Sequence, residues 1–154
     1  MGIEIERKFL VKYAPWNAQT PVQYFIQGYI QRDHNRVVRV RIADDQGFLT
    51  IKGPKEKGAG LEFEYEIPKD DALTLIETLC DQPCIEKNRY HINHQGFDWV
   101  IDEFFNENQG LVLAEIELSS VDQDFVKPEW LGKEVTHDLR YYNASLIERP
   151  YVTW

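Results

Sequence analysis

Charged and apolar residues alternate along one short segment of the chain after another, and this alternation restricts the fold more than any other feature. Successive side chains of a β-strand point to opposite faces of the sheet. In the first segment Glu4, Glu6 and Lys8 therefore share one face, whereas Ile5 and Phe9 share the other. Later segments repeat the arrangement, with Arg, Lys, Glu or Asp opposite aliphatic and aromatic residues. The pattern predicts a chain built mainly from β-strands, each with one charged face.

The alternating segments mark eight expected strands, at residues 3–11, 22–31, 36–42, 48–53, 61–67, 84–94, 97–104 and 111–119. Gly, Asn and Asp residues in the connecting turns allow most neighbouring strands to run antiparallel. Apolar residues at helical spacing predict two helices, at residues 70–79 and 136–147, and a short helical turn at 121–125. We therefore expect an α+β fold that is mainly β, namely a closed eight-stranded antiparallel β-barrel with helices packed outside. The chain is expected to form a single domain over residues 1–154.

The charged faces of these strands carry like-charged neighbours two residues apart. The pairs are Arg39 and Arg41, Glu62 and Glu64, Lys87 and Arg89, and Glu115 and Glu117. Same-sign neighbours on one face of a sheet are mildly destabilising, so stability alone does not explain them, whereas a bound ligand does. Basic side chains suit the oxygens of a linear polyphosphate, and carboxylates suit hard divalent cations such as Mg²⁺ or Mn²⁺. The charged faces are therefore expected to line a hydrophilic tunnel inside the barrel.

Overall charge and composition exclude several other classes of function. A net charge of −9 argues against binding to duplex nucleic acid, which depends on many Lys and Arg contacts to phosphates. No apolar run is long enough to cross a membrane, and the chain starts with a charged, strand-like segment rather than a signal peptide. We therefore expect a cytoplasmic protein with no membrane partner. Cys80 and Cys84 are interpreted as idle thiols, and the four histidines as surface residues.

The stretch Glu4-Ile5-Glu6-Arg7-Lys8 resembles the ExExK signature of the CYTH superfamily, the triphosphate tunnel metalloenzymes. Later clusters follow in the order that is typical of this family: Gln27-Gly28-Tyr29, Arg39-Val40-Arg41, Thr50-Ile51-Lys52-Gly53, Glu62-Phe63-Glu64, Lys87-Asn88-Arg89, Asp102, and Ala114-Glu115-Ile116-Glu117-Leu118. The segments 130–136 and 141–146 are similar to the C-terminal part of the short bacterial members. The resemblance covers essentially the whole chain.

The resemblance implies roles for the charged residues of the tunnel. It implies two bound ions, Mg²⁺ or Mn²⁺, one held by Glu4, Glu6 and Glu117 and a second supported by Glu115 and Asp102. The implied phosphate-binding residues are Lys8, Arg39, Arg41, Lys52, Lys87 and Arg89. Glu62 or Glu64 would orient or deprotonate the attacking water, Lys8 would neutralise charge at the reacting phosphorus, and Tyr29 would shape the tunnel.

One segment departs from the family pattern. No arginine stands two residues before Glu62, where several relatives have one. We interpret residues 55–60 as a flexible, solvated run of charges, with the alternative that Lys55 or Lys57 reaches the mouth of the tunnel.

The function implied by the resemblance is a metal-dependent hydrolase acting on small-molecule triphosphates. The leading hypothesis is an inorganic tripolyphosphatase that releases pyrophosphate and phosphate, with nucleoside triphosphates as secondary substrates. The alternatives are a class IV adenylate cyclase and a thiamine triphosphatase. A protein of another class, a non-catalytic module that binds polyphosphate or nucleotide, is also an alternative. A homodimer is compatible with the sequence but does not follow from it.

Overall fold

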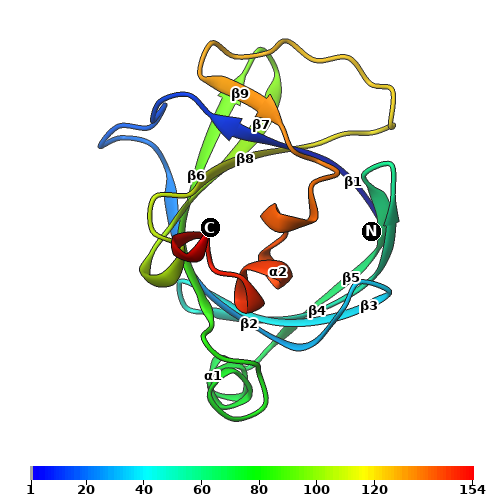
Figure 1. The fold of residues 1–154 in the computed structure, drawn as a ribbon, viewed down its shortest axis with the longest axis vertical. Coiled ribbons are helices and arrows are strands. Elements are labelled where there is room, and N and C mark those ends of the chain that lie inside the picture. Colours follow the sequence, from blue (N-terminus) through cyan, green and yellow to red (C-terminus); the bar gives the residue numbers. More distant parts are fainter. Residues whose placement is uncertain (1) are drawn as a thin grey trace.

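Eight antiparallel strands close into a barrel in the computed structural model, which describes residues 2–154. The strands are β1 (Ile3–Val11), β2 (Val22–Asp33), β3 (Arg36–Ala43), β4 (Gln46–Glu56), β5 (Ala59–Ile67), β6 (Ile85–His94), β7 (Phe97–Phe104) and β8 (Val112–Glu117). Their order around the barrel is β5-β4-β3-β2-β6-β7-β8-β1, and β1 pairs back onto β5 (Figure 1). The predicted closed barrel is confirmed, and the predicted strands agree with the observed ones to within a few residues.

Strand β1 closes the barrel with only part of its length. One edge of β1 pairs with β8, so that Glu6 lies opposite Glu117 and Lys8 lies opposite Glu115. The other edge is divided between β5, which pairs with Ile3–Ile5, and a ninth strand, β9 (Leu131–Glu134), which pairs near Phe9 and Val11. The sequence did not predict β9, because four residues are too few to show an alternating pattern.

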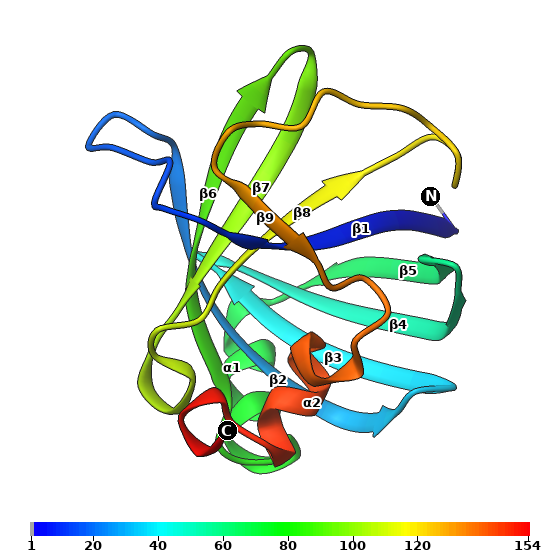
Figure 2. The same cartoon turned by 45° about the horizontal axis from the view of Figure 1, so that its top comes forward.

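The turn between β4 and β5 corrects the prediction for residues 55–60. This segment is not a flexible charge run, because β4 continues through Glu56 and a two-residue turn of Lys57 and Gly58 leads directly into β5. Both turn residues have positive φ, at 53° and 80°, which is the geometry of a tight hairpin turn and favours glycine at the second position. The turn docks on β1, where the backbone N–H of Glu6 donates to the carbonyl of Gly58 at 3.1 Å (Figure 2).

Helix α1 (Lys69–Thr78) covers the outside of the barrel, as predicted. It packs its buried residues Ala72 and Ile76 against Val40 and Ile42 of β3. Close packing explains the glycine at position 28, since a Cβ there would lie 2.7 Å from Cβ of Cys80. Both cysteines are free thiols, as predicted. Another part of the outer surface is covered by the aromatic cluster around Phe9, Trp99 and Trp130.

The C-terminal segment differs from the predicted helix at residues 136–147. A short 3₁₀ turn (η2, Leu139–Tyr141) is followed by α2 (Asn143–Glu148) and by a second 3₁₀ turn (η3, Tyr151–Thr153). The side chain of Asp138 accepts a hydrogen bond from the backbone N–H of Arg140, and Tyr142 has an extended backbone that separates the two helical pieces. The prediction of a short helix at residues 121–125 is wrong. Residues 121–122 form a non-helical turn, and residues 123–125 have no regular secondary structure.

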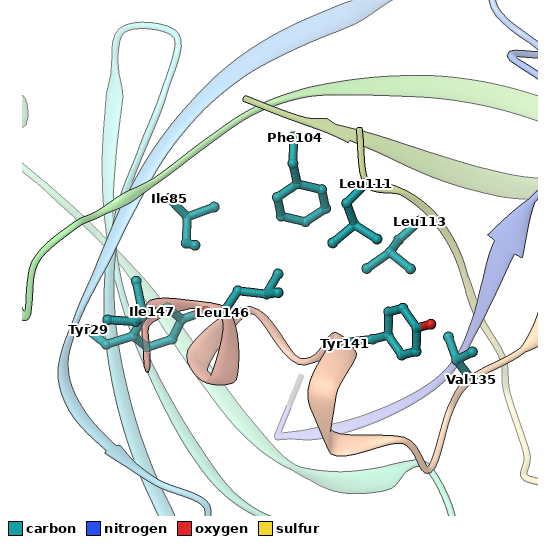
Figure 3. Close-up of a cluster of buried hydrophobic side chains, with 9 residues drawn as sticks. All are labelled: Tyr29, Ile85, Phe104, Leu111, Leu113, Val135, Tyr141, Leu146 and Ile147. Atoms are coloured by element: carbon teal, nitrogen blue, oxygen red, sulfur yellow. The ribbon is translucent and has the colours of Figure 1, made fainter. Parts of the chain in front are cut away.

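Helix α2 lies within the ring of strands rather than outside it (Figure 1). Its residues Leu146 and Ile147 pack against Ile85, Phe104 and Leu113, which stand on the inward faces of β6, β7 and β8 (Figure 3). The core therefore has an internal part, and the C-terminal segment fills one end of the barrel. None of the described helices has the length and apolar character needed to cross a bilayer.

Candidate functional site

A cavity of about 740 Å³ occupies the part of the barrel that α2 leaves open. Side chains from most of the strands and from the C-terminal segment line it. The predicted site residues that line it are Glu4, Glu6, Lys8, Tyr29, Arg39, Arg41, Lys52, Glu62, Glu64, Lys87, Arg89, Glu115 and Glu117. Asp102 is the predicted site residue that does not line it. The alternation of side chains along each strand thus directs these charges into one space.

Carboxylates gather where β1 lies between β8 and β5. Glu4 and Glu6 lie beside Glu117 across the β1–β8 pairing, and Glu62 approaches from β5. Burial and the negative charges of Glu4, Glu62 and Glu6 together raise the pKa of Glu117 above its ordinary value. The part of this pKa shift that comes from the neighbouring carboxylates reflects mutual repulsion, which a cation in the cluster relieves.

Two lysines of β4 stand among these carboxylates. The Nζ of Lys52 lies 3.4 Å from Glu4 Oε1 and 3.3 Å from Glu62 Oε1. The Nζ of Lys55 lies 3.0 Å from Glu4 Oε1 and also contacts Glu6 Oε1. Burial and Glu4 raise the pKa of Glu6, but Lys55, Glu115 and Lys52 outweigh them and lower it to about 2.

The carboxylates suit a divalent cation by their chemistry, because carboxylate oxygen is the ligand that Mg²⁺ and Mn²⁺ prefer. Within residues 2–154 no three His, Cys, Asp or Glu side chains converge into a ready metal cluster. The two ammonium groups of β4 lie between them instead. The carboxylates therefore fit a divalent cation once the ammonium groups of Lys52 and Lys55 move away from them.

Lys55 lines the cavity, in agreement with the alternative interpretation of residues 55–60, although it was not among the predicted site residues. A strict alternation from Lys52 would place Lys55 on the opposite face, but a shift of register between these residues turns it inward. Pro54 was the available signal, because proline within a strand marks an edge or a bulge.

Two basic side chains of the cavity, Arg41 and Lys8, have no carboxylate partner among the described residues. The Nε of Arg41 donates to Gln27 Oε1 at 2.9 Å, and within the described part of the chain no carboxylate lies within ion-pair distance of Arg41. Burial, followed by the repulsion of Arg39 and Arg89, lowers the pKa of Arg41 to about 9. Lys8, only 6% exposed, donates from Nζ to the carbonyl of Tyr141 at 3.2 Å.

Arg39 lies within ion-pair distance of Glu62 and Glu64, but it adds an unsatisfied donor to the same side of the cavity. Its Nη2 reaches Thr50 Oγ1 at 3.1 Å and Glu64 Oε1 at 3.4 Å. Its buried Nε has no hydrogen-bond partner among the described residues. Buried donors of this kind are almost always paired in native proteins. The basic wall of the cavity, formed by Lys8, Arg39, Arg41, Lys87 and Arg89, is therefore suited to an anion with several oxygens.

Glu62 and Glu64 are both held by basic neighbours. Burial raises the pKa of Glu62, but Lys52, Glu4 and Arg39 outweigh it and lower the pKa below its ordinary value. Glu64 Oε1 accepts a hydrogen bond from Thr50 Oγ1 at 2.9 Å. Glu62 is therefore ionised at neutral pH and able to accept a proton.

Asp102 lies behind the basic wall instead of facing the cavity. It is 1% exposed, and its oxygens accept hydrogen bonds from Arg89 Nε at 2.8 Å, Arg89 Nη2 at 2.9 Å and Lys87 Nζ at 2.8 Å. In this arrangement it serves as the buried counter-ion of two basic side chains. A role as metal ligand would require Asp102 to release these contacts.

Helix α2 contributes a residue, Asn143, to the hydrogen bonds around the basic residues, and the sequence analysis did not predict this role. Asn143, at the start of α2, accepts hydrogen bonds on Oδ1 from Lys87 Nζ at 2.7 Å and from Gln27 Nε2 at 2.9 Å. Gln27 Nε2 also donates to Tyr29 Oη at 3.1 Å. The C-terminal segment thus holds Lys87 and Gln27 in place. This tertiary contact could not be predicted from any local sequence pattern.

Comparison with known proteins agrees with the sequence signature. The family model described as the CYTH domain matches residues 2–151. A relative from Acetivibrio thermocellus named inorganic triphosphatase is 47% identical over 151 residues, which cover 98% of this chain and 97% of the relative. A second relative of that name, from Nitrosomonas europaea, is 35% identical over 150 residues, covering 93% and 95%. A crystal structure described as an inorganic triphosphatase superposes with a TM-score of 0.68 at 32% identity, covering 93% of this chain and 96% of the other.

Proposed function

The chain belongs to the CYTH domain family, and from this premise we propose that it is a metal-dependent hydrolase that cleaves inorganic tripolyphosphate to pyrophosphate and phosphate. The observation that carries the proposal is the unmatched positive charge, within residues 2–154, of Arg41 and Lys8, with the unpartnered Nε of Arg39, which faces a crowded carboxylate cluster across one cavity. A linear anion with many oxygens satisfies the first group, and divalent cations satisfy the second.

The basic residues bind the substrate. Lys8, Arg39, Arg41, Lys52, Lys87 and Arg89 surround the space that the polyphosphate would enter. The charge that develops on the phosphoryl oxygens in the transition state would be stabilised by these fixed cations, which are already oriented by Gln27, Thr50, Asp102 and Asn143. Tyr29, 3% exposed, supports this wall through Gln27 and shapes the cavity.

The carboxylates of β1 and β8 would hold the cations. We assign Glu4, Glu6, Glu115 and Glu117 to this role and propose two ions, Mg²⁺ or Mn²⁺. When bound, such ions neutralise phosphate charge and lower the pKa of a coordinated water.

Glu62 is the residue that we propose as the proton acceptor, with Glu64 orienting the same water. A water oxygen attacks the terminal phosphorus, the bond between that phosphorus and the bridging oxygen breaks, and pyrophosphate leaves. The proton of the attacking water passes to the Glu62 carboxylate and then to solvent. The neighbouring cations keep Glu62 ionised before the reaction and favour release of the accepted proton to solvent.

A product assay on the purified protein tests the proposed function. Tripolyphosphate, ATP and thiamine triphosphate are offered in parallel with Mg²⁺, with Mn²⁺ and with EDTA. We expect phosphate release to be fastest from tripolyphosphate and to fall about a hundredfold or more in EDTA, because the carboxylates alone supply no positive charge to the phosphates. Measurement of phosphate, pyrophosphate and cyclic AMP separates the outcomes.

Each other outcome of the assay points to a different function. Cyclic AMP and pyrophosphate from ATP would identify a cyclase instead. Fastest release from thiamine triphosphate would identify a thiamine triphosphatase. Tight binding of tripolyphosphate without any turnover would favour the non-catalytic module. The mass of the protein in solution would test the homodimer in the same preparation.

A further inference from the structure

The ammonium group of Lys55 lies between Glu4 and Glu6, the two carboxylates of the ExExK signature. Its Nζ lies 3.0 Å from Glu4 Oε1 and also contacts Glu6 Oε1. The three side chains are 18%, 13% and 17% exposed, so they are largely shielded from water and from bulk ions. An ammonium that bridges two shielded carboxylates stands where a divalent cation would need to bind both.

The local backbone is shaped to bring Lys55 to this position. The shift of register between Lys52 and Lys55 turns the side chain inward, and Lys55 pairs with Gly60 of β5. A Cβ at Gly60 would lie 3.0 Å from Lys55 Cγ and 2.8 Å from the carbonyl oxygen of Pro54. The absence of a side chain at Gly60 therefore leaves the space through which the stem of Lys55 reaches the cluster.

We propose that Lys55 is a built-in competitor of the divalent cation, and that it makes cation binding depend on the arrival of the polyphosphate. This inference rests on the proposed function. A cation that enters alone must displace the ammonium of Lys55 and leave it without a counter-ion in a shielded cavity, which is costly. A cation that enters with a polyphosphate supplies phosphate oxygens as the new partner of Lys55. The residue acts as a positioning residue that favours the metal-bound triphosphate over the bare cation.

Titration of the metal-free protein with Mn²⁺, followed by calorimetry, tests the proposal. Lys55→Met removes the ammonium and keeps the stem that passes Gly60. We expect this variant to bind Mn²⁺ at least about tenfold more tightly than the wild type, since the competing charge is gone. Lys57→Met is the matched control, because it removes the same charge from an exposed turn residue two positions away and is expected to leave the affinity unchanged.

A second set of measurements separates this inference from the proposed function. Glu6→Gln is expected to weaken Mn²⁺ binding, which establishes that the titration reports on this cluster. Unchanged or weaker Mn²⁺ binding by Lys55→Met would overturn the role of Lys55, even if the wild type hydrolyses tripolyphosphate. Tighter binding by Lys55→Met in a protein that hydrolyses nothing would support the competition while refuting the proposed function.

The stability of the variant provides a further readout. If Lys55→Met folds poorly without metal, Mn²⁺ is expected to raise its melting temperature more than it raises that of the wild type. An equal or smaller rise would count against the proposal.

Discussion

Replacing Glu6 with glutamine is expected to lower tripolyphosphate turnover by about a thousandfold or more while the barrel stays folded. The carboxylate of Glu6 lies in the cavity beside Glu4 and Glu115 and not in an apolar cluster. Glutamine has nearly the same shape but carries no negative charge to hold a divalent cation. The loss is therefore expected in kcat, because the interaction that is removed stabilises charge that develops during the reaction.

Glu66→Gln is the matched control for this experiment. Glu66 stands on the same strand as Glu62 and Glu64, but it is exposed and does not line the cavity. Steady-state rates are measured for both variants, and far-ultraviolet circular dichroism and thermal melting verify their folds. Wild-type turnover by a folded Glu6→Gln protein would remove Glu6 from the site and with it the assignment of the metal cluster.

The charged faces of the strands could be predicted from the sequence because side-chain direction in a strand is a local property. Arg39 and Arg41, or Glu115 and Glu117, point the same way whatever the rest of the chain does. Once the strands close into a barrel, all such faces meet inside it. The resemblance to the CYTH family, which the comparisons confirm, added the assignment of roles.

Features that depend on contacts between distant segments could not be predicted in this way. Strand β9 consists of four residues whose extended form depends on pairing with β1. The place of α2 inside the barrel follows from apolar residues such as Ile85, Phe104 and Leu113, which stand on the same faces as the charged residues of β6, β7 and β8. These interruptions of the charged faces were the available sign that one end of the tunnel is filled.

Lys55 and Asp102 show the same limit within the site. The inward direction of Lys55 arises from a bulge, which breaks the two-residue period on which the prediction depended. The two-residue alternation correctly predicts that Asp102 points into the barrel, but Lys87 and Arg89 separate it from the cavity. Which inward residues face the cavity and which lie behind it depends on side-chain packing around the whole barrel.

Replacing Asp102 with asparagine is expected to lower the free energy of unfolding by about 3–5 kcal/mol, the usual effect of removing one partner of a buried ion pair. The change would leave Lys87, which is 1% exposed, without its counter-ion and Arg89 with only Glu115, 3.8 Å away. The amide of asparagine retains the size of the side chain, so the effect reports the lost charge rather than a cavity. Urea unfolding at neutral pH, followed by circular dichroism, measures it.

The stability lost in Asp102→Asn is also expected to depend on pH. Burial raises the pKa of Asp102, but Arg89 and Lys87 outweigh it and lower the pKa from 3.8 to about 2. Because the pKa is lower in the folded state, the stabilisation is present above the unfolded value and disappears as the pH falls through the folded one. The difference in stability between the two proteins should therefore shrink by about 2–3 kcal/mol between about pH 4 and pH 2. Asp98→Asn, at an exposed position of the same strand, is the control and should match the wild type in stability at every pH. If the free energy of unfolding of Asp102→Asn lies within about 1 kcal/mol of the wild-type value at neutral pH, Asp102 is not the counter-ion that holds Lys87 and Arg89 in place.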